Sequence, residues 1–119
     1  MLERARVESI SSESEVLFVR CSGVFGGGTD GIPDANRIRQ AIENWMRENS
    51  QQRVKEIVVD FTAVVYVQGD SPAAMLLPLM KSGINKFRIL ASSQNKGALE
   101  SLVTMLGLVS LGFSVEGKV

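Results

Sequence analysis

Few side chains in this sequence are suited to catalysis, and they are acids, hydroxyls and a single thiol. The chain has 119 residues and no histidine, which excludes histidine-based triads, histidine general bases and histidine ligands for zinc or haem. Cys21 is the only cysteine, so an intrachain disulfide and a thiolate metal site are excluded as well. Because Cys21 stands in an apolar, β-prone stretch, we expect a buried and unreactive thiol.

Two acids close in sequence, Asp60 and Asp70, are the remaining candidates for general acid–base work or for holding Mg²⁺. We expect Asp60 at the end of a central strand. No third acid, histidine or nearby lysine completes such a site, and Thr62 indicates a turn after Asp60. We therefore expect no catalytic residue, no metal ligand and no cofactor.

The glycine-rich run from Gly26 to Gly31 lies between a predicted strand and a predicted helix, where phosphate-binding turns occur. It lacks the Lys-Ser/Thr pair of a P-loop and the spacing of a dinucleotide fingerprint, and Asp30 would repel a phosphate. Asp34 also occupies the expected helix start, as an N-cap. A flexible loop, or one that touches a partner, is therefore favoured over a nucleotide site.

Ser71 lies in the polar break Gln68-Gly69-Asp70-Ser71-Pro72, which precedes an apolar helical stretch. As a helix cap, Asp70 or Ser71 would accept a hydrogen bond from the first turn, with Pro72 at the first helical position. As a phosphoacceptor, Ser71 would place its phosphate at the positive end of the helix dipole. Without further context, capping is the favoured role.

Strands and helices alternate along the chain, with one apolar stripe on each predicted helix. The order ββαβαβαβ predicts a single α/β domain over residues 1–119. Its sheet should be mixed and mostly parallel, with four or five strands and helices mainly on one face. The predicted elements are an antiparallel hairpin of Arg4–Ile10 and Val16–Phe25 around a polar turn Ser11–Glu15, a helix from Asp34, a strand Ile57–Phe61, a helix Ala73–Lys81, a strand Phe87–Ala91, a helix Asn95–Leu106 and a strand Phe113–Val115.

The charge balance excludes some partners. The chain has 13 Lys and Arg against 13 Asp and Glu, which gives no electrostatic case for duplex DNA or an anionic membrane. The apolar stretch Pro72–Met80 is too short to span a bilayer, and we expect no signal peptide in the first residues. We expect a cytoplasmic protein. From Phe61 to Met80 the only charge is Asp70, which indicates burial or an apolar surface awaiting a partner.

Taken together, these segments resemble the STAS domain, named for sulphate transporters and anti-sigma-factor antagonists. The strongest match is Val59-Asp60-Phe61-Thr62-Ala63-Val64 followed by Tyr66-Val67, which is similar to the family's Asp-Leu-Ser-x-Val-x-Phe-Ile run. The resemblance covers nearly the whole chain, and the order of strands and helices is the family's order. It also includes Val16–Phe25, the helix from Asp34, Phe87–Ala91 and Leu99-Glu-Ser-Leu.

The resemblance implies a bacterial, non-enzymatic signalling module that regulates transcription. In the anti-sigma-factor antagonists, an unmodified STAS domain binds a serine kinase that doubles as an anti-sigma factor, and so frees the sigma factor. Phosphorylation of a serine in an Asp-Ser-Ser/Thr-Gly-Leu loop adds charge at the contact and breaks the complex. The partner-binding loop would here be Gln68, Gly69, Asp70, Ser71 and Pro72.

This loop departs from the family motif. Counted without gaps from Asp60, the phosphoacceptor position falls on Gly69, and no switch would exist; this alignment keeps the expected spacing to Gly83 and is slightly favoured. With two inserted residues, the motif's Asp-Ser falls on Asp70-Ser71, which makes Ser71 the phosphoacceptor candidate.

Two alternatives remain at this point. STAS-like proteins also serve as structural subunits of multi-protein assemblies or of lipid and anion transport machinery, without a phospho-switch, and a homodimer would fit either role. A small nucleotide-binding protein that uses the Gly26–Gly31 run is the weaker alternative. The role of the Gly26–Pro33 loop is left open.

Overall fold

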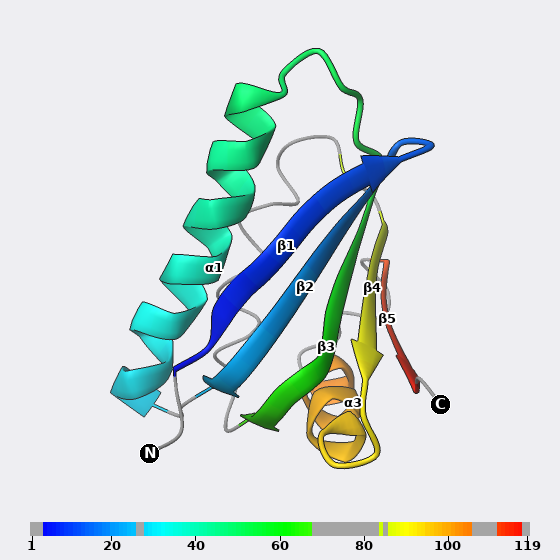
Figure 1. Ribbon diagram of the computed structural model, residues 1–119. Helices are drawn as coiled ribbons and strands as arrows, with labels where there is room; N and C mark the ends of the chain where they lie inside the picture. The colour runs from blue at the N-terminus through cyan, green and yellow to red at the C-terminus, as the bar shows by residue number, and fades with distance from the viewer. Residues whose placement is uncertain (1–3, 26–27, 68–83, 85, 106–111, 118–119) are drawn as a thin grey trace.

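The structure is a computed structural model, and it describes residues 4–25, 28–67, 84, 86–105 and 112–117 (Figure 1). Its five strands form one sheet in the order β1-β2-β3-β4-β5. The elements are β1 (Arg6–Glu13), β2 (Val16–Phe25), α1 (Gly28–Glu48), β3 (Glu56–Val67), β4 (Lys86–Ala91), α3 (Lys96–Met105) and β5 (Phe113–Gly117).

The sheet is mixed. β1 pairs antiparallel with β2, and the pairs β2–β3, β3–β4 and β4–β5 are parallel. The predicted α/β class, the hairpin and the mostly parallel sheet of five strands are confirmed. The helix expected over Ala73–Lys81 lies outside the described residues, so the full predicted order stays a prediction.

The sheet has an inner face, against which α1 and α3 pack, and an outer face turned away from both helices (Figure 1). In β2 the alternation is regular: Leu17, Val19 and Cys21 are buried on the inner face, whereas Phe18 and Arg20 are exposed on the outer face. This two-residue period is what a half-covered strand requires.

The inner face forms one continuous core with the helices. Ile38 and Ile42 of α1 and Leu99 and Val103 of α3 are buried in it, as the apolar stripes predict. Aromatic side chains fill the space between strands and helices, with two ring pairs whose centroids lie 5.7 Å and 4.6 Å apart, namely Phe25–Phe61 and Phe87–Phe113.

The prediction that Asp34 caps a helix is wrong. α1 begins at Gly28, so that Pro33 and Asp34 lie inside the helix and part of the expected Gly26–Pro33 loop is helical. The Asp34 carboxylate is buried; Arg4 donates to both of its oxygens, and Arg37 donates to its Oδ1 at 3.0 Å. A buried carboxylate needs such partners, and these ion pairs override the local capping preference.

The prediction that Asp60 ends its strand is also wrong, because β3 continues to Val67. The strand continues past Asp60 because its pairing with β2 continues through two register shifts. Ser22 pairs with Ala63 between the two shifts, and Phe25 pairs with Val67 after both. Such bulges let a strand pass a local polar turn without leaving the sheet.

The predicted turn Ser11–Glu15 is shorter in the structure. β1 reaches Glu13, and only Ser14 and Glu15 turn, with φ angles of 53° and 66°. Two central residues with positive φ are typical of the tight hairpin turn that matches strand twist, in which glycine and asparagine are preferred. Neither residue here is of that type, so the turn is strained.

We expect Glu15→Gly to stabilise the fold. Glycine removes the steric cost of the left-handed conformation, which is about 1–2 kcal/mol, and loses about 0.5–1 kcal/mol in backbone entropy. The net gain in the free energy of unfolding should therefore be on the order of 0.5–1 kcal/mol, measured by urea denaturation. The matched control Glu13→Gly, in the adjoining strand, should destabilise by a similar amount; a loss of stability in both variants would contradict the assignment.

Candidate functional site

Asp60 and Thr62 form a local hydrogen-bonded unit in the bulged part of β3. The Asp60 Oδ1 atom accepts hydrogen bonds from the Thr62 backbone amide at 2.8 Å and from the Thr62 hydroxyl at 2.5 Å. Aspartate commonly bonds its own backbone two residues on in this way. This carboxylate oxygen therefore shapes the bulge, as the proximity of Thr62 in the sequence indicates.

Asn95 joins this part of β3 to the next crossover. Its side chain is buried, with a residue exposure of 2%. Its Nδ2 atom donates to the carbonyl oxygens of Phe61 at 2.9 Å and Val64 at 3.0 Å, and its Oδ1 atom accepts from the Ser92 amide at 2.9 Å. Its own carbonyl accepts from the Leu99 amide at 3.1 Å, at the start of α3.

Of the two carbonyls that Asn95 binds, that of Phe61 lies within the Asp60–Thr62 unit and that of Val64 lies two residues after it. Both carbonyls lie in the part of β3 where its pairing with β2 shifts register. A buried amide that donates to both carbonyls and accepts from the Ser92 amide fixes the bulge to the β4–α3 turn. Sequence reasoning placed Asn95 at a helix start but missed this contact, which joins residues more than thirty positions apart.

The predicted partner-binding loop comes directly after β3, the strand whose bulge Asn95 contacts. β3 ends at Val67, which pairs with Phe25, the last residue of β2, so both strands end at the same edge of the sheet. Loops at the carboxyl ends of parallel strands are the usual place for binding sites in such sheets. Gln68, Gly69, Asp70, Ser71 and Pro72 themselves lie outside the described residues.

Cys21 is buried in the core, as the sequence predicts. Burial, and then the negative charges of Asp60 and Glu8, raise the pKa of its thiol to about 12. Because the thiolate is the reactive form, this cysteine is not suited to nucleophilic chemistry at neutral pH.

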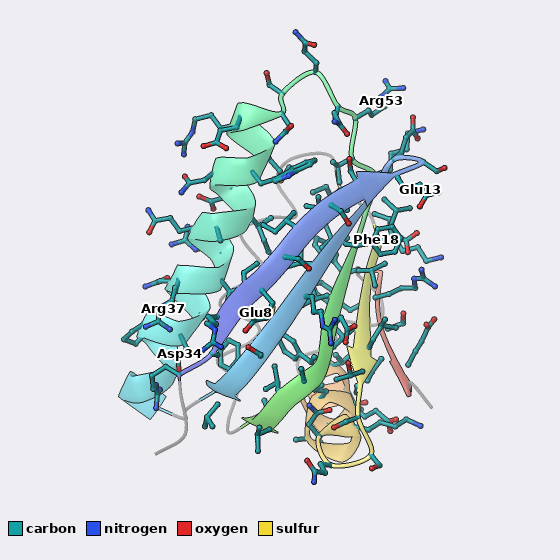
Figure 2. The ribbon with its side chains drawn as sticks, in the orientation of Figure 1. Glu8, Glu13, Phe18, Asp34, Arg37 and Arg53 are labelled. Atoms are coloured by element: carbon teal, nitrogen blue, oxygen red, sulfur yellow. The ribbon has the colours of Figure 1, made fainter. Side chains whose placement is uncertain are left out.

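The outer face of the sheet carries a shallow hollow next to an exposed aromatic ring. The hollow has a volume of about 240 Å³. The exposed ring is Phe18, which is 39% exposed and is labelled in Figure 2. Apolar side chains of three strands form part of its wall beside serine hydroxyls and one charge of each sign. Its lining residues are Ser9, Ser11, Phe18, Val19, Arg20, Val58, Asp60 and Leu90.

Charged side chains beside the hollow are paired along the same face. Arg88 lies between Glu56, at 2.6 Å, and Glu116, at 3.6 Å. Glu8 accepts hydrogen bonds from the Ser22 hydroxyl and, at 2.9 Å, from Arg6, and these contacts lower the pKa of its carboxyl. The Arg6–Glu8 pair is exposed and adds little to stability, whereas the Arg88–Glu56 pair is half-buried.

Among the residues that the structure describes, no three His, Cys, Asp or Glu side chains are grouped so that they could hold a metal ion. Within the same residues, no helix is both long and apolar enough to cross a membrane.

Removing the Asn95 amide should weaken the fold strongly. Asn95→Ala leaves two buried carbonyls and one amide without their partner, and we expect a loss of about 2–4 kcal/mol in the free energy of unfolding. Urea denaturation measures this loss. The exposed Asn36→Ala, which removes only a contact with Arg39, is the matched control and should change stability by less than about 0.5 kcal/mol. Equal effects in the two variants would contradict the role of Asn95.

The raised pKa of Cys21 predicts a pH dependence. The folded thiol keeps its proton up to about pH 12, whereas the unfolded thiol loses it near pH 9. The folded state then binds more protons, so stability should fall as pH rises above about 9, by up to about 1.4 kcal/mol per pH unit. Cys21→Ala should lack this part of the fall in urea denaturation, and identical pH profiles for the two proteins would contradict the assignment.

Comparison of the chain with models of known protein families and with curated proteins found no match. The described residues form an α/β fold with a mixed five-stranded sheet, in which Asn95 is hydrogen-bonded to the backbone of β3. The chain's family stays an expectation from the sequence.

Proposed function

We propose that this chain is a non-enzymatic, STAS-like interaction module of the anti-sigma-factor-antagonist type. Its partner would be a serine-kinase anti-sigma factor, bound through the segment from Gln68 to Pro72. The observation that carries the proposal is the position of this segment in the chain. It comes directly after β3, whose backbone is held by hydrogen bonds from Asn95. Recognition loops work best when a rigid scaffold positions them.

The chemistry of the neighbouring described residues supports a binding role over a catalytic one. The Oδ1 atom of Asp60 is engaged by Thr62, and Asn95 uses its amide to hold the backbone of β3. Burial in the core raises the pKa of the Cys21 thiol. Each of these groups serves the shape of the sheet, which is what an interaction module requires.

Regulation depends on how the loop aligns with the phosphorylation motif. If the gapped alignment holds, phosphate on Ser71 adds about two negative charges to the contact and releases the kinase. If the ungapped alignment holds, Gly69 occupies the acceptor position and binding is constitutive. The ungapped alignment is slightly favoured because it preserves the spacing to Gly83.

Both alignments are tested by one titration. The purified chain is mixed with serine-kinase anti-sigma factors of the same organism, with and without ATP, and binding is measured by calorimetry and phosphate by intact mass. We expect binding that ATP does not reverse, and Gly69→Ser should make it ATP-sensitive, with affinity falling at least about tenfold after phosphorylation.

Phosphate on the unaltered chain that disappears in Ser71→Ala would instead establish the gapped alignment. Ser50→Ala, an exposed serine that follows α1, is the matched control and should change neither binding nor phosphate. Failure of every cognate kinase to bind would overturn the proposed function.

A structural subunit of a larger assembly is the second candidate, and the charge distribution favours it. Only one charged residue, Asp70, stands between Phe61 and Met80, as expected of a surface covered by a permanent partner. Co-purification with a transporter ATPase as a stable complex would support this candidate and contradict the sigma-pathway proposal.

Nucleotide binding by the Gly26–Gly31 run is the weakest candidate, and a thermal shift tests it, because a ligand of the folded state raises the melting temperature.

A further inference from the structure

We propose that a second copy of this chain covers the outer face of the sheet, so that two sheets pack face to face around a two-fold axis. None of the described helices packs on this face, because α1 and α3 share one core on the inner face (Figure 1). Three of the four strand pairs are parallel, and sheets that are wholly parallel are almost always covered on both faces. This proposal goes beyond the proposed function, which concerns the carboxyl end of β3.

The centre of the outer face is suited to contact. Phe18 is one of two large apolar side chains exposed on the described surface, and it borders the hollow of about 240 Å³. Val58 lies on the wall of the hollow and is buried, with 2% exposure, and Leu90 on the same wall is half-buried. A projecting ring next to a hollow lets one surface serve as both knob and socket, which a two-fold interface requires.

The pairing register arranges the outer-face side chains in rows across the strands. One row is Ser11, Phe18, Val58 and Arg88, and the next row toward the carboxyl edge is Ser9, Arg20, Asp60 and Leu90. On β1, Glu13 lies one row before these two and Arg6 one row after them.

An axis that runs across the strands, midway between the two rows, exchanges one row for the other. Phe18 of one copy then lies opposite Arg20 of the second copy, which is a favourable cation–π pairing. Leu90 lies opposite the aliphatic part of Arg88. The strands of the two sheets run antiparallel to one another in this arrangement, as in an aligned sheet packing.

The same axis brings opposite charges together at the rim. Glu13 of one copy lies opposite Arg6 of the second copy, and the exchange occurs twice by symmetry. Asp60 lies opposite Val58 and therefore meets no carboxylate. Arg6 already pairs with Glu8 in its own chain at 2.9 Å, so the added contact extends an existing exposed cluster.

An axis along β3 is less favourable, because it places Asp60 opposite Asp60 and Glu56 opposite Glu56. Like charges that face each other across an interface oppose association. Charge complementarity thus selects the axis across the strands, and the second copy as occupant, because one face supplies both members of each pair.

Sedimentation equilibrium of the purified chain alone tests this proposal between about 5 and 500 µM, the range of a weak dimer with a small interface. We expect a monomer–dimer equilibrium. Phe18→Ala should raise the dissociation constant at least about tenfold, because it removes the central contact. Val65→Ala removes the other exposed apolar side chain, which lies on β3 beyond both rows. This control should change the dissociation constant less than about threefold.

Charge exchange gives a second test that does not depend on removing apolar surface. Arg6→Glu alone and Glu13→Arg alone each place like charges opposite each other, and each variant should dimerise at least about tenfold more weakly. An equimolar mixture of the two variants should form a heterodimer with nearly the original affinity, because one rim pair then keeps its original charges and the other is restored with reversed sign.

A monomer at all concentrations would overturn the proposal, as would a dimer that is unaffected by Phe18→Ala and by both charge variants, or variants that are not rescued by mixing. None of these measurements involves a kinase, so failure here leaves the proposed function untouched, and failure of kinase binding leaves the dimer untouched.

Discussion

The strand β3 is buried from solvent over most of its length. The rest of the fold depends on how that burial is achieved. Ile57, Val59 and Phe61 turn toward the helices and are fully buried, while Val58 on the outer face is only 2% exposed. The backbone of such a strand must find every hydrogen bond inside the protein. Flanking strands β2 and β4 supply most of them, and the Asn95 side chain supplies two where the ladder shifts register.

That arrangement also explains why the polar residues near β3 are structural. The Asp60 carboxylate stabilises the bulge through Thr62, and the Asn95 amide ties the bulge to the turn before α3. The bulge lies between the pairing of Arg20 with Asp60 and that of Phe25 with Val67. A rigid end to this strand gives the following segment a fixed starting point, on which the proposed binding role depends.

The sequence predicts the elements whose signal is local and periodic. Alternation of buried and exposed residues identifies β2, and the stripe that includes Ile38 and Ile42 identifies α1. The predicted start of α1 is wrong because the Asp34 carboxylate binds Arg4, thirty residues away, instead of capping the helix. The predicted end of β3 is wrong because the strand continues through its pairing with β2, which is also a long-range contact. Long-range contacts of this kind leave no periodic pattern.

The candidate site is less predictable than the fold. A buried thiol at Cys21 follows from its apolar neighbours, and the structure bears this out. The Asn95 contact could not be predicted, because an asparagine at a helix start looks like an ordinary cap. The hollow beside Phe18 depends on cross-strand register, which a two-residue period leaves undetermined for strands joined by long crossovers.

Amide hydrogen exchange of the chain, alone and with a bound serine-kinase anti-sigma factor, tests the central claim most directly. If the segment after β3 is the binding surface, the partner should slow exchange in peptides covering residues 68–72 and leave the β1–β2 hairpin turn unchanged. Slowed exchange confined to the hairpin or to β5, with residues 68–72 unaffected, would contradict the proposed role of this segment.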